Sequence, residues 1–491
     1  MIGLLGVLIL AMASEINDQV STIAIADIQG GLAMSHDPST WFSSLYVSAE
    51  IVGMATSPWL LVTFTLRRWT LFVAGLCCVS SVLIPFSPDI AGIYALRVLQ
   101  GLSGGFALPL LMTTALRVLT PDIRLYGLAV YALTATFTPA LGAPLAAFWT
   151  HSVGWRFVFY EAVPYCVLAA ALAWHGLPQD QPQYQRFRII DWPGMLLLVI
   201  GFGAFSTMLY QGDRLDWFDS KLICVLALVS AISIPLFVLN EWFHPLPLLK
   251  LQLLGRPNIC YGAIALFLFL LVAQSGSTVP FRYLAQVQGF RPEQLQGLTL
   301  MIAIPQIVLL PAVAWLLDHR SVDARLVNLI GLMLIIASCV GASFVNPFWQ
   351  GGQFVLWQSL QAVGQPMVVL PLLMLSTNSV SKPEEGPFAS ALVNVPRAIA
   401  EATGVWMFDL ITRWRGGLHY NQLVDQLGRD SGRLPALGSP SQAGGLVQAQ
   451  ATVLTLSDTY LVLAAITLVL VVILLLLAKP SLPPRLQLAK R

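Results

Sequence analysis

Eight charged side chains lie inside long apolar stretches of this chain. They are Glu15, Asp18, Glu50, Arg97, Glu161, Arg397, Glu401 and Asp409. A charge at the centre of a bilayer costs at least roughly 2.5–3.5 kcal/mol, so such a residue normally faces a cavity and a partner. Burial favours the protonated form of a carboxyl group, whereas a nearby arginine favours the charged form. A carboxylate whose arginine partner approaches and withdraws can therefore bind and release a proton. A static ion pair between helices is the alternative interpretation.

The spacing of these residues places them on common helix faces. Glu15, Asp18 and Gln19 are three and four residues apart, which is one face of a helix, and Asn17 lies beside that face. The same spacing recurs around the two arginines. The groups are Arg97, Gln100, Gly101 and Gly104, and Asn394, Arg397 and Glu401. At a rise of about 1.5 Å per residue, Asp18 and Arg97 can share a level in one half of a membrane.

The composition identifies the class of protein that must position these side chains. Only 10% of the 491 residues are charged, 57% are hydrophobic, and the net charge is +2, whereas a soluble domain has about 25% charged residues. Soluble and disordered proteins are therefore excluded. Without a basic excess, we expect no nucleic-acid partner. The cysteines lie in apolar runs and no Gly-rich nucleotide loop occurs, so we expect no metal ion, no cofactor and no ATP hydrolysis.

Fourteen apolar segments are long enough to cross a membrane as helices, which needs about 20 residues each. They are 2–27, 40–63, 70–88, 91–116, 125–149, 157–177, 192–211, 220–240, 258–281, 294–317, 324–345, 351–377, 387–411 and 453–477. The sequence therefore predicts an all-α integral membrane protein. Lys and Arg predominate in the loops that would be cytoplasmic if both termini were cytoplasmic, which favours that orientation.

Several short motifs resemble those of the fourteen-span drug/proton antiporters of the major facilitator superfamily, and the resemblance covers nearly the whole chain. The segment 97–101 resembles the R-x-x-Q-G motif of span 4, and 138–144 resembles the antiporter motif of span 5. Segments 155–159 and 163–164 resemble the opening of span 6. Residues 191–194, 215–218, 241 and 247–248 resemble landmarks around two extra central spans, and 394–397 matches the N-x-x-R of span 13.

Two departures from the family pattern affect the expected site. Asn17 stands where the family has an aspartate in span 1, with Glu15 and Asp18 on either side. Either the carboxyl that carries the proton has moved by one residue to Asp18, or Glu15 has taken over its role. The loop after span 2, residues 58–68, lacks the acidic residue and both glycines that form a conformational latch in the family. Only the basic pair Arg67 and Arg68 is kept.

The resemblance implies a major facilitator fold of two six-helix bundles with two extra central helices. The expected bundles are 1–177 and 258–477, and the extra helices are 192–240. The expected connections are a cytoplasmic linker at 178–191, a cytoplasmic loop at 241–257, a long periplasmic loop at 412–452 and a cytoplasmic tail at 478–491.

Residues and resemblance together predict three groups of functional residues. Proton coupling is assigned to Glu15, Asp18, Arg97 and Glu401. The substrate cavity is assigned to Asn17, Gln19, Glu50, Gln100, Glu161, Asn394 and Arg397. Conformational change is assigned to Gly101, Gly104, Gly142 and Pro144, because small residues let helices approach closely and proline bends a helix.

The resemblance implies a proton-coupled exporter of amphipathic toxic compounds or drugs in a bacterial inner membrane, and no enzyme activity. Its expected partners are a small-molecule substrate, protons and membrane lipid. A periplasmic adaptor and an outer-membrane channel are further candidate partners, with docking at the long outer loop; the alternative is a connector that binds nothing. Export of one specific metabolite or siderophore, or a membrane-embedded enzyme or sensor, are the alternative functions.

Overall fold

The computed structural model describes residues 2–319, 321–380, 385–429 and 440–477, which form helices and contain no β-strand. The α-helices are α1 (Ile2–Ile23), α2 (Ile25–Leu32), α3 (His36–Phe64), α4 (Leu66–Leu83), α5 (Ile90–Val118), α6 (Arg124–Thr136), α7 (Thr138–Ser152), α8 (Phe157–Tyr160), α9 (Ala162–Gly176), α10 (Trp192–Gln211), α11 (Lys221–Phe243), α12 (Pro257–Ala273), α13 (Thr278–Gln286), α14 (Pro292–Leu317), α15 (Ala324–Ala342), α16 (Gly351–Asn378), α17 (Gly386–Arg429) and α18 (Pro440–Leu475). Short 3₁₀ helices follow α4, α9, α10 and α11.

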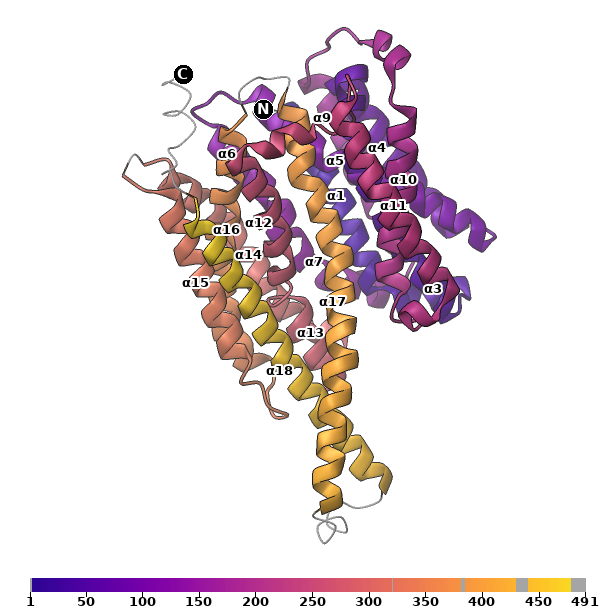
Figure 1. Ribbon diagram of the computed structural model, residues 1–491, viewed down its shortest axis with the longest axis vertical. Coiled ribbons are helices and arrows are strands. Elements are labelled where there is room, and N and C mark those ends of the chain that lie inside the picture. The colour runs from indigo at the N-terminus through magenta and orange to yellow at the C-terminus, as the bar shows by residue number, and fades with distance from the viewer. Residues whose placement is uncertain (1, 320, 381–384, 430–439, 478–491) are drawn as a thin grey trace.

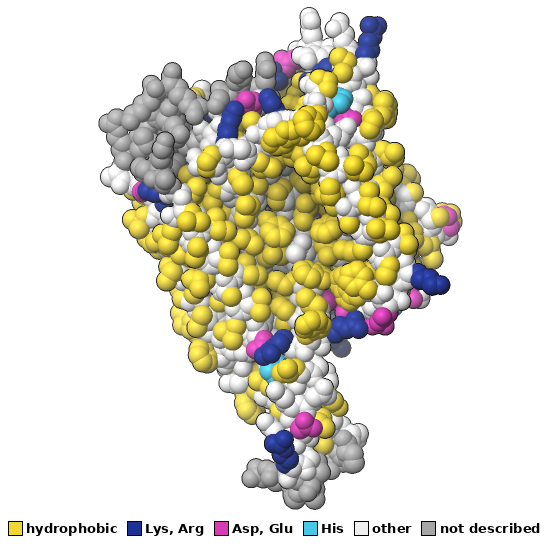
Figure 2. All heavy atoms as spheres, viewed as in Figure 1, with side chains coloured by type: hydrophobic (Ala, Val, Ile, Leu, Met, Phe, Trp, Pro, Cys, Tyr) yellow, Lys and Arg dark blue, Asp and Glu magenta, His cyan; other side chains and the backbone are white. Residues whose placement is uncertain are grey.

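The helices are suited to a membrane by length and composition. Within the described ranges, 12 helical segments qualify as spans, and α6 with α7 makes a further one if this bent pair is a single span. The long helix α17 carries more charge but lies between α3, α12 and α18 within the bundle (Figure 1). Hydrophobic side chains cover the middle of the molecule, and charged side chains gather towards its two ends (Figure 2). The predicted all-α membrane fold is confirmed.

The predicted fifth span is broken into α6 and α7, which are bent by 47°. The break lies at Phe137, and Pro139 follows two residues later in the first turn of α7. Proline is tolerated in a first turn because its missing N–H has no partner there in any case. Gly142 and Pro144, which the sequence assigned to bending, lie inside α7 after this break. The bend of this structure therefore lies at Phe137, and the role of Gly142 and Pro144 in conformational change stays a prediction.

The segment 412–452, expected to be a long loop, is largely helical, which corrects the prediction. Helix α17 continues to Arg429, and α18 begins at Pro440. Arg415 Nε and His419 Nε2 of α17 both lie 2.6 Å from Asp458 Oδ2 of α18. These ion pairs stabilise the polar ends of the two helices against each other. The helices have 44 and 36 residues, so they are about 66 and 54 Å long and outreach a hydrocarbon core of about 30 Å.

Helices α10 and α11 pack against each other, and α10 also packs against α3 and α17 (Figure 1). Ser48 Oγ of α3 lies 2.6 Å from Ser206 Oγ of α10. The turn after α10 contacts both sides of the molecule, because Arg214 pairs with Asp37 at 3.2 Å and Asp216 pairs with Arg413 of α17 at 2.8 Å. These two helices therefore connect the two halves at the end of the bundle opposite Ile2 and Leu475.

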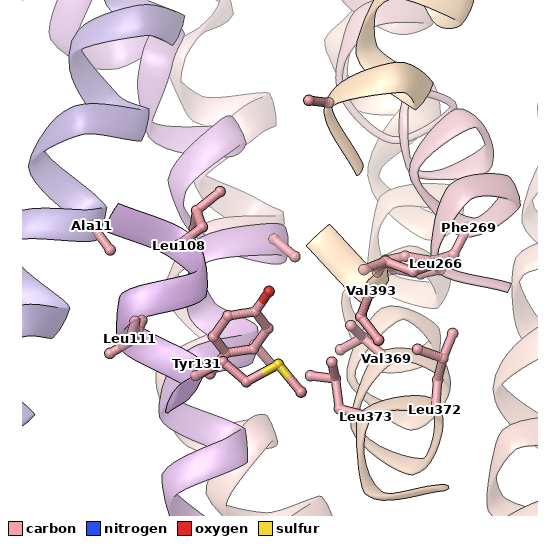
Figure 3. Close-up of a cluster of buried hydrophobic side chains, with 14 of the residues drawn as sticks. Ala11, Leu108, Leu111, Tyr131, Leu266, Phe269, Val369, Leu372, Leu373 and Val393 are labelled. Atoms are coloured by element: carbon pink, nitrogen blue, oxygen red, sulfur yellow. The ribbon is translucent and has the colours of Figure 1, made fainter. Parts of the chain in front are cut away.

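An apolar contact joins the two halves nearer the end that holds Ile2 and Leu475. Leu108, Leu111 and Tyr131 of α5 and α6 face Val369, Leu373 and Val393 of α16 and α17, as Figure 3 shows. All six side chains are buried. Ser390 Oγ also donates to Pro109 O across this contact at 3.2 Å. The halves are thus held together on both sides of the buried charges.

Candidate functional site

The buried charges form two ion pairs that share helix α1. Arg97 Nη2 of α5 lies 2.6 Å from Asp18 Oδ1, and Arg397 Nη2 of α17 lies 2.6 Å from Glu15 Oε2. The side chains are shielded, with an exposed fraction of 0% for Arg97, 7% for Asp18, 8% for Arg397 and 13% for Glu15. Arg97 belongs to the same half as α1, whereas Arg397 belongs to the other half. Neighbouring turns of α1 are therefore bound to opposite halves.

The guanidinium of Arg97 has hydrogen-bond and aromatic partners on several sides. Its Nη1 donates to Gln100 Oε1 at 2.6 Å, and its Nε donates to Phe42 O at 3.3 Å. Its guanidinium carbon lies 4.3 Å from the ring centre of Phe42 and 4.2 Å from that of Tyr46. Asp18 therefore supplies the counter-charge, while the carbonyl, amide and rings fix the orientation of the guanidinium.

Asn17 makes neutral hydrogen bonds beside this pair. Gln100 Nε2 donates to Asn17 Oδ1 and, at 3.1 Å, to Ser81 Oγ. Asn17 Nδ2 donates to Val158 O at 2.8 Å. Gln100 thus links Arg97 to Asn17 without placing a second charge there. The arginine of span 4 pairs with Asp18, one residue beyond the position where the family has its aspartate.

The second arginine is held by the helix break between α6 and α7. Arg397 Nη1 donates to Thr134 Oγ1 at 3.0 Å, and Nη2 donates to Thr134 O at 2.8 Å. Tyr131 Oη, one turn earlier, donates to Asn394 Oδ1, and Asn394 Nδ2 donates to Ser390 O at 2.8 Å. The pair Arg397–Glu15 therefore forms part of a polar contact between α17 and the opposite half.

Two further acids lie in the same electrostatic cluster. Glu50 is 3% exposed, and its Oε2 has no hydrogen-bond partner among the described residues. Glu401 of α17 interacts electrostatically with Asp18, Glu15, Glu50 and both arginines. Four carboxyl groups face two guanidiniums, so an electrically balanced cluster must hold protons or a cationic group.

Sequence reasoning missed the tyrosines of this cluster. Tyr46 of α3 and Tyr210 of α10 both interact electrostatically with Asp18, Glu50 and Arg97. A tyrosine in an apolar span is normally a packing residue, so its spacing gave no signal. Thr134, which binds Arg397 through its backbone carbonyl and its hydroxyl, had no signal either.

Other predicted residues lie outside these ion pairs. Trp149 Nε1 donates to Glu161 Oε2, and Glu161 Oε1 has no partner within the described part of the chain. No described hydrogen bond or ion pair joins Glu161 to the cluster. The Cβ of Gln19 lies 2.9 Å from the position that a Cβ on Gly142 would take, so these two residues mark a close contact of α1 with α7.

The predicted glycines of α5 allow close packing against α3. A Cβ at Gly101 would lie 2.3 Å from Tyr46 O, and one at Gly105 would lie 2.2 Å from Glu50 O. A Cβ at Gly104 would lie 2.5 Å from Tyr46 Oη. Because backbone oxygens cannot rotate away, Gly101 and Gly105 set the distance that brings Tyr46 and Glu50 to the cluster.

Replacing Gly105 by Ala is expected to lower the free energy of unfolding by about 1–3 kcal/mol, since the added methyl group overpacks this contact. The matched control is Gly75→Ala on α4, where no atom lies within 4 Å of the added Cβ. That change removes a glycine from a helix and is expected to leave stability equal or higher. Thermal unfolding of both purified variants checks whether the midpoint falls in Gly105→Ala and does not fall in Gly75→Ala. Equal midpoints would contradict the close contact.

Comparisons with known proteins identify the family of this chain. The family model described as Major Facilitator Superfamily matches residues 5–405. The Multidrug export protein EmrB of Escherichia coli K12 is 24% identical over 437 residues, covering 89% of this chain and 85% of that protein. The Fatty acid resistance protein FarB of Neisseria gonorrhoeae is 25% identical over 430 residues, covering 85% and 82%.

A solved structure supports the fold independently of these names. The proton:xylose symporter XylE, a protein of the same superfamily, aligns with a TM-score of 0.56 at 12% identity, covering 100% of this chain and 98% of that chain. The resemblance to fourteen-span drug/proton antiporters is confirmed by the relatives. The chain is a multi-pass membrane protein that belongs to the major facilitator superfamily.

Proposed function

We propose that this protein is a proton-coupled exporter of amphipathic toxic compounds that works by alternating access. The ion pair between Glu15 and Arg397, at 2.6 Å, carries the proposal, because it joins α1 to the opposite half. The named function of the relative EmrB, multidrug export, supports the direction of transport and the class of substrate.

The coupling follows from the charges of the cluster. A proton bound to Glu15 removes the anion that Arg397 faces, which weakens the link between α1 and α17. A proton on Asp18 does the same for Arg97, although that arginine keeps its bonds to Phe42 and Gln100. Protonation therefore loosens the contact between the halves more than the contact within one half. Rocking of the two halves about this cluster is the motion expected of such a transporter.

Substrate binding competes with protons in this scheme. An amphipathic cation can take the place of the proton at Glu50 or Glu401, since either supplies the positive charge that the four acids require. Binding of a proton and binding of the substrate at these acids then exclude each other, as exchange of one for the other requires. Export of a single metabolite remains the second candidate, because the relative FarB is named for resistance to fatty acids alone.

We propose transport in a bacterial inner membrane, with both termini cytoplasmic and no chemical conversion of the substrate. The family and the fold are those of transporters, and the distribution of Lys and Arg supports the orientation. Purified protein in proteoliposomes with an imposed pH gradient tests the function. We expect the proteoliposomes to accumulate a fluorescent lipophilic cation, and we expect this accumulation to be lost when the pH gradient is removed. Transport of the substrate that does not depend on the pH gradient would contradict proton coupling. No transport of any substrate would favour a sensor.

The projecting ends of α17 and α18 support the proposal of a periplasmic adaptor, working with an outer-membrane channel. Three apolar side chains of α17 are exposed there: Trp414 by 72%, Val424 by 44% and Leu418 by 41%. They lie beyond the length that the hydrocarbon core requires, where water would otherwise cover them. We propose that this face of α17 docks the adaptor.

Replacing Leu418 and Val424 together by Glu is expected to reduce whole-cell resistance about tenfold, since a carboxylate disrupts an apolar interface. Transport in proteoliposomes is expected to stay unchanged, because no adaptor is present there. The control is Gln426→Glu, an exposed polar position of the same helix that points away from Val424 and Trp414. Unchanged resistance in the double variant would remove the docking proposal and leave the helical hairpin as a connector.

A further inference from the structure

A cavity of about 480 Å³ lies between α13, α17 and α18, away from the central charges. It is at the end of the bundle opposite Ile2 and Leu475, where α17 and α18 run side by side (Figure 1). Its walls include Arg282 and Gln286 of α13, Phe408 and Thr412 of α17, and Thr455 of α18. The cavity therefore belongs to one half of the protein and does not form part of the contact between halves.

Arg282 is the cation of this cavity. Its guanidinium carbon lies 5.0 Å from the ring centre of Phe408, and the described residues provide it with no ion pair and no hydrogen bond. Asp409 attracts it electrostatically but lies beyond ion-pair distance. A guanidinium presents five N–H donors, and those of Arg282 face the cavity without a partner among the described residues. An anionic group that entered the cavity would satisfy them.

The other walls complement an organic molecule better than a bare ion. Thr412 Oγ1 donates to Phe408 O at 2.8 Å, and Thr455 Oγ1 donates to Ala451 O at 2.7 Å. With their protons engaged, these hydroxyls present oxygen lone pairs to the cavity. Phe408 and Leu456 add apolar surface, and Tyr420 adds an aromatic ring. A carboxylate fits the planar fork of a guanidinium in a paired geometry, and its apolar body fits the remaining wall.

We propose that this cavity binds an organic anion, namely a carboxylate attached to an apolar or aromatic body. The site is distinct from the acidic cluster of Glu15, Asp18, Glu50 and Glu401, which would repel such an anion. Its place as a subsite at the outer end of an exporter rests on the proposed function, whereas its chemistry rests on Arg282 and the cavity alone.

Binding to the full-length protein in lipid nanodiscs tests the site, by equilibrium dialysis of radiolabelled 2-naphthoate and of its uncharged analogue 2-naphthamide. The unaltered protein is expected to bind the carboxylate at least about tenfold more tightly than the amide, as a charge-assisted pair requires. Arg282→Gln is expected to remove that preference. Arg429→Gln, an exposed arginine later on α17, is the control and is expected to bind as the unaltered protein does.

A second variant tests the cavity without touching its charge. A Cβ at Gly416 would lie 3.5 Å from Thr455 Oγ1, so Gly416→Leu places a larger side chain against this wall. This variant is expected to lose binding of 2-naphthoate about tenfold or more, because it fills the space that the ligand needs. If Arg282→Gln and Gly416→Leu both bind the carboxylate as the unaltered protein does, or if the amide binds equally well, the proposal is overturned.

The double variant Glu15→Gln with Asp18→Asn separates this site from the proposed function. It is expected to lose proton-coupled transport and to keep Arg282-dependent binding of 2-naphthoate. Arg282-dependent binding in a protein that fails to couple protons to efflux supports the outer site and contradicts the proposed function. Coupled efflux by a protein without Arg282-dependent binding supports the proposed function and contradicts the outer site.

Discussion

Proteoliposomes containing the double variant Glu15→Gln with Asp18→Asn are expected to show no proton-driven efflux. Both amides keep the shape and the acceptor oxygen of the acids, but neither can bind and release a proton at physiological pH. Each substitution also removes the anion of a pair held at 2.6 Å. Removing one partner from a buried pair costs roughly 3–5 kcal/mol of folding stability, so the folding of this variant must be checked together with its transport.

Binding and folding controls make this result specific to coupling. Glu241→Gln is the matched control, since Glu241 is also a buried acid but accepts a hydrogen bond from the backbone N–H of Leu249 and pairs with no arginine among the described residues. It is expected to keep coupled efflux. Each variant should give a monodisperse peak in size-exclusion chromatography before its transport is measured. Retained efflux that still responds to the pH gradient in the double variant would remove Glu15 and Asp18 from the coupling mechanism.

The second large effect is expected at Arg97. Arg97→Gln leaves Asp18 as a buried anion without its counter-charge, so the free energy of unfolding should fall by about 3–5 kcal/mol. Adding Asp18→Asn to the same chain removes that uncompensated charge and is expected to restore much of the stability. Coupled transport should remain absent in both variants. Thermal unfolding checks the predicted change in stability, and proteoliposome transport, measured on the same preparations, checks the predicted loss of coupling.

A non-additive pattern is the signature of this pair. Residues in direct contact show a coupling energy in a double-mutant cycle, whereas independent residues add. Arg156→Gln, an exposed arginine between α7 and α8, is the control and should change neither stability nor transport. Arg97→Lys should fail to replace the arginine, because lysine lacks the planar fork that reaches Asp18 and Gln100 together. Additive losses for Arg97→Gln and Asp18→Asn would show that the two side chains act separately.

The sequence alone determined the class and most of the spans of this protein. A charged fraction of 10% cannot cover a soluble surface, and the number and length of the apolar segments follow from hydrophobicity that is counted locally. The eight buried charges were also visible, because a charge in an apolar run needs no three-dimensional information to be recognised. Their common helix faces followed from the helical period.

Only the tertiary structure decided which charges meet. Successive residues of α1 point about 100° apart, so a shift of one position changes the helix that a side chain faces. Packing therefore assigned Asp18 to Arg97, Asn17 to Gln100 and Glu15 to Arg397. The same packing left Glu161 with Trp149 and brought Tyr210 of α10 to the cluster.

The extent of α17 shows the same division between local and distant causes. Its residues 412–429 are polar and include Gly416 and Gly417, a composition typical of a loop when taken alone. Asp458, which pairs with Arg415 and His419 from α18, supports a helix there instead. The membrane-spanning segments depend on hydrophobicity summed over neighbouring residues, so the sequence alone can predict them. Ion pairs depend on the rotation and depth of helices that are hundreds of residues apart, and those are fixed only when the whole bundle packs.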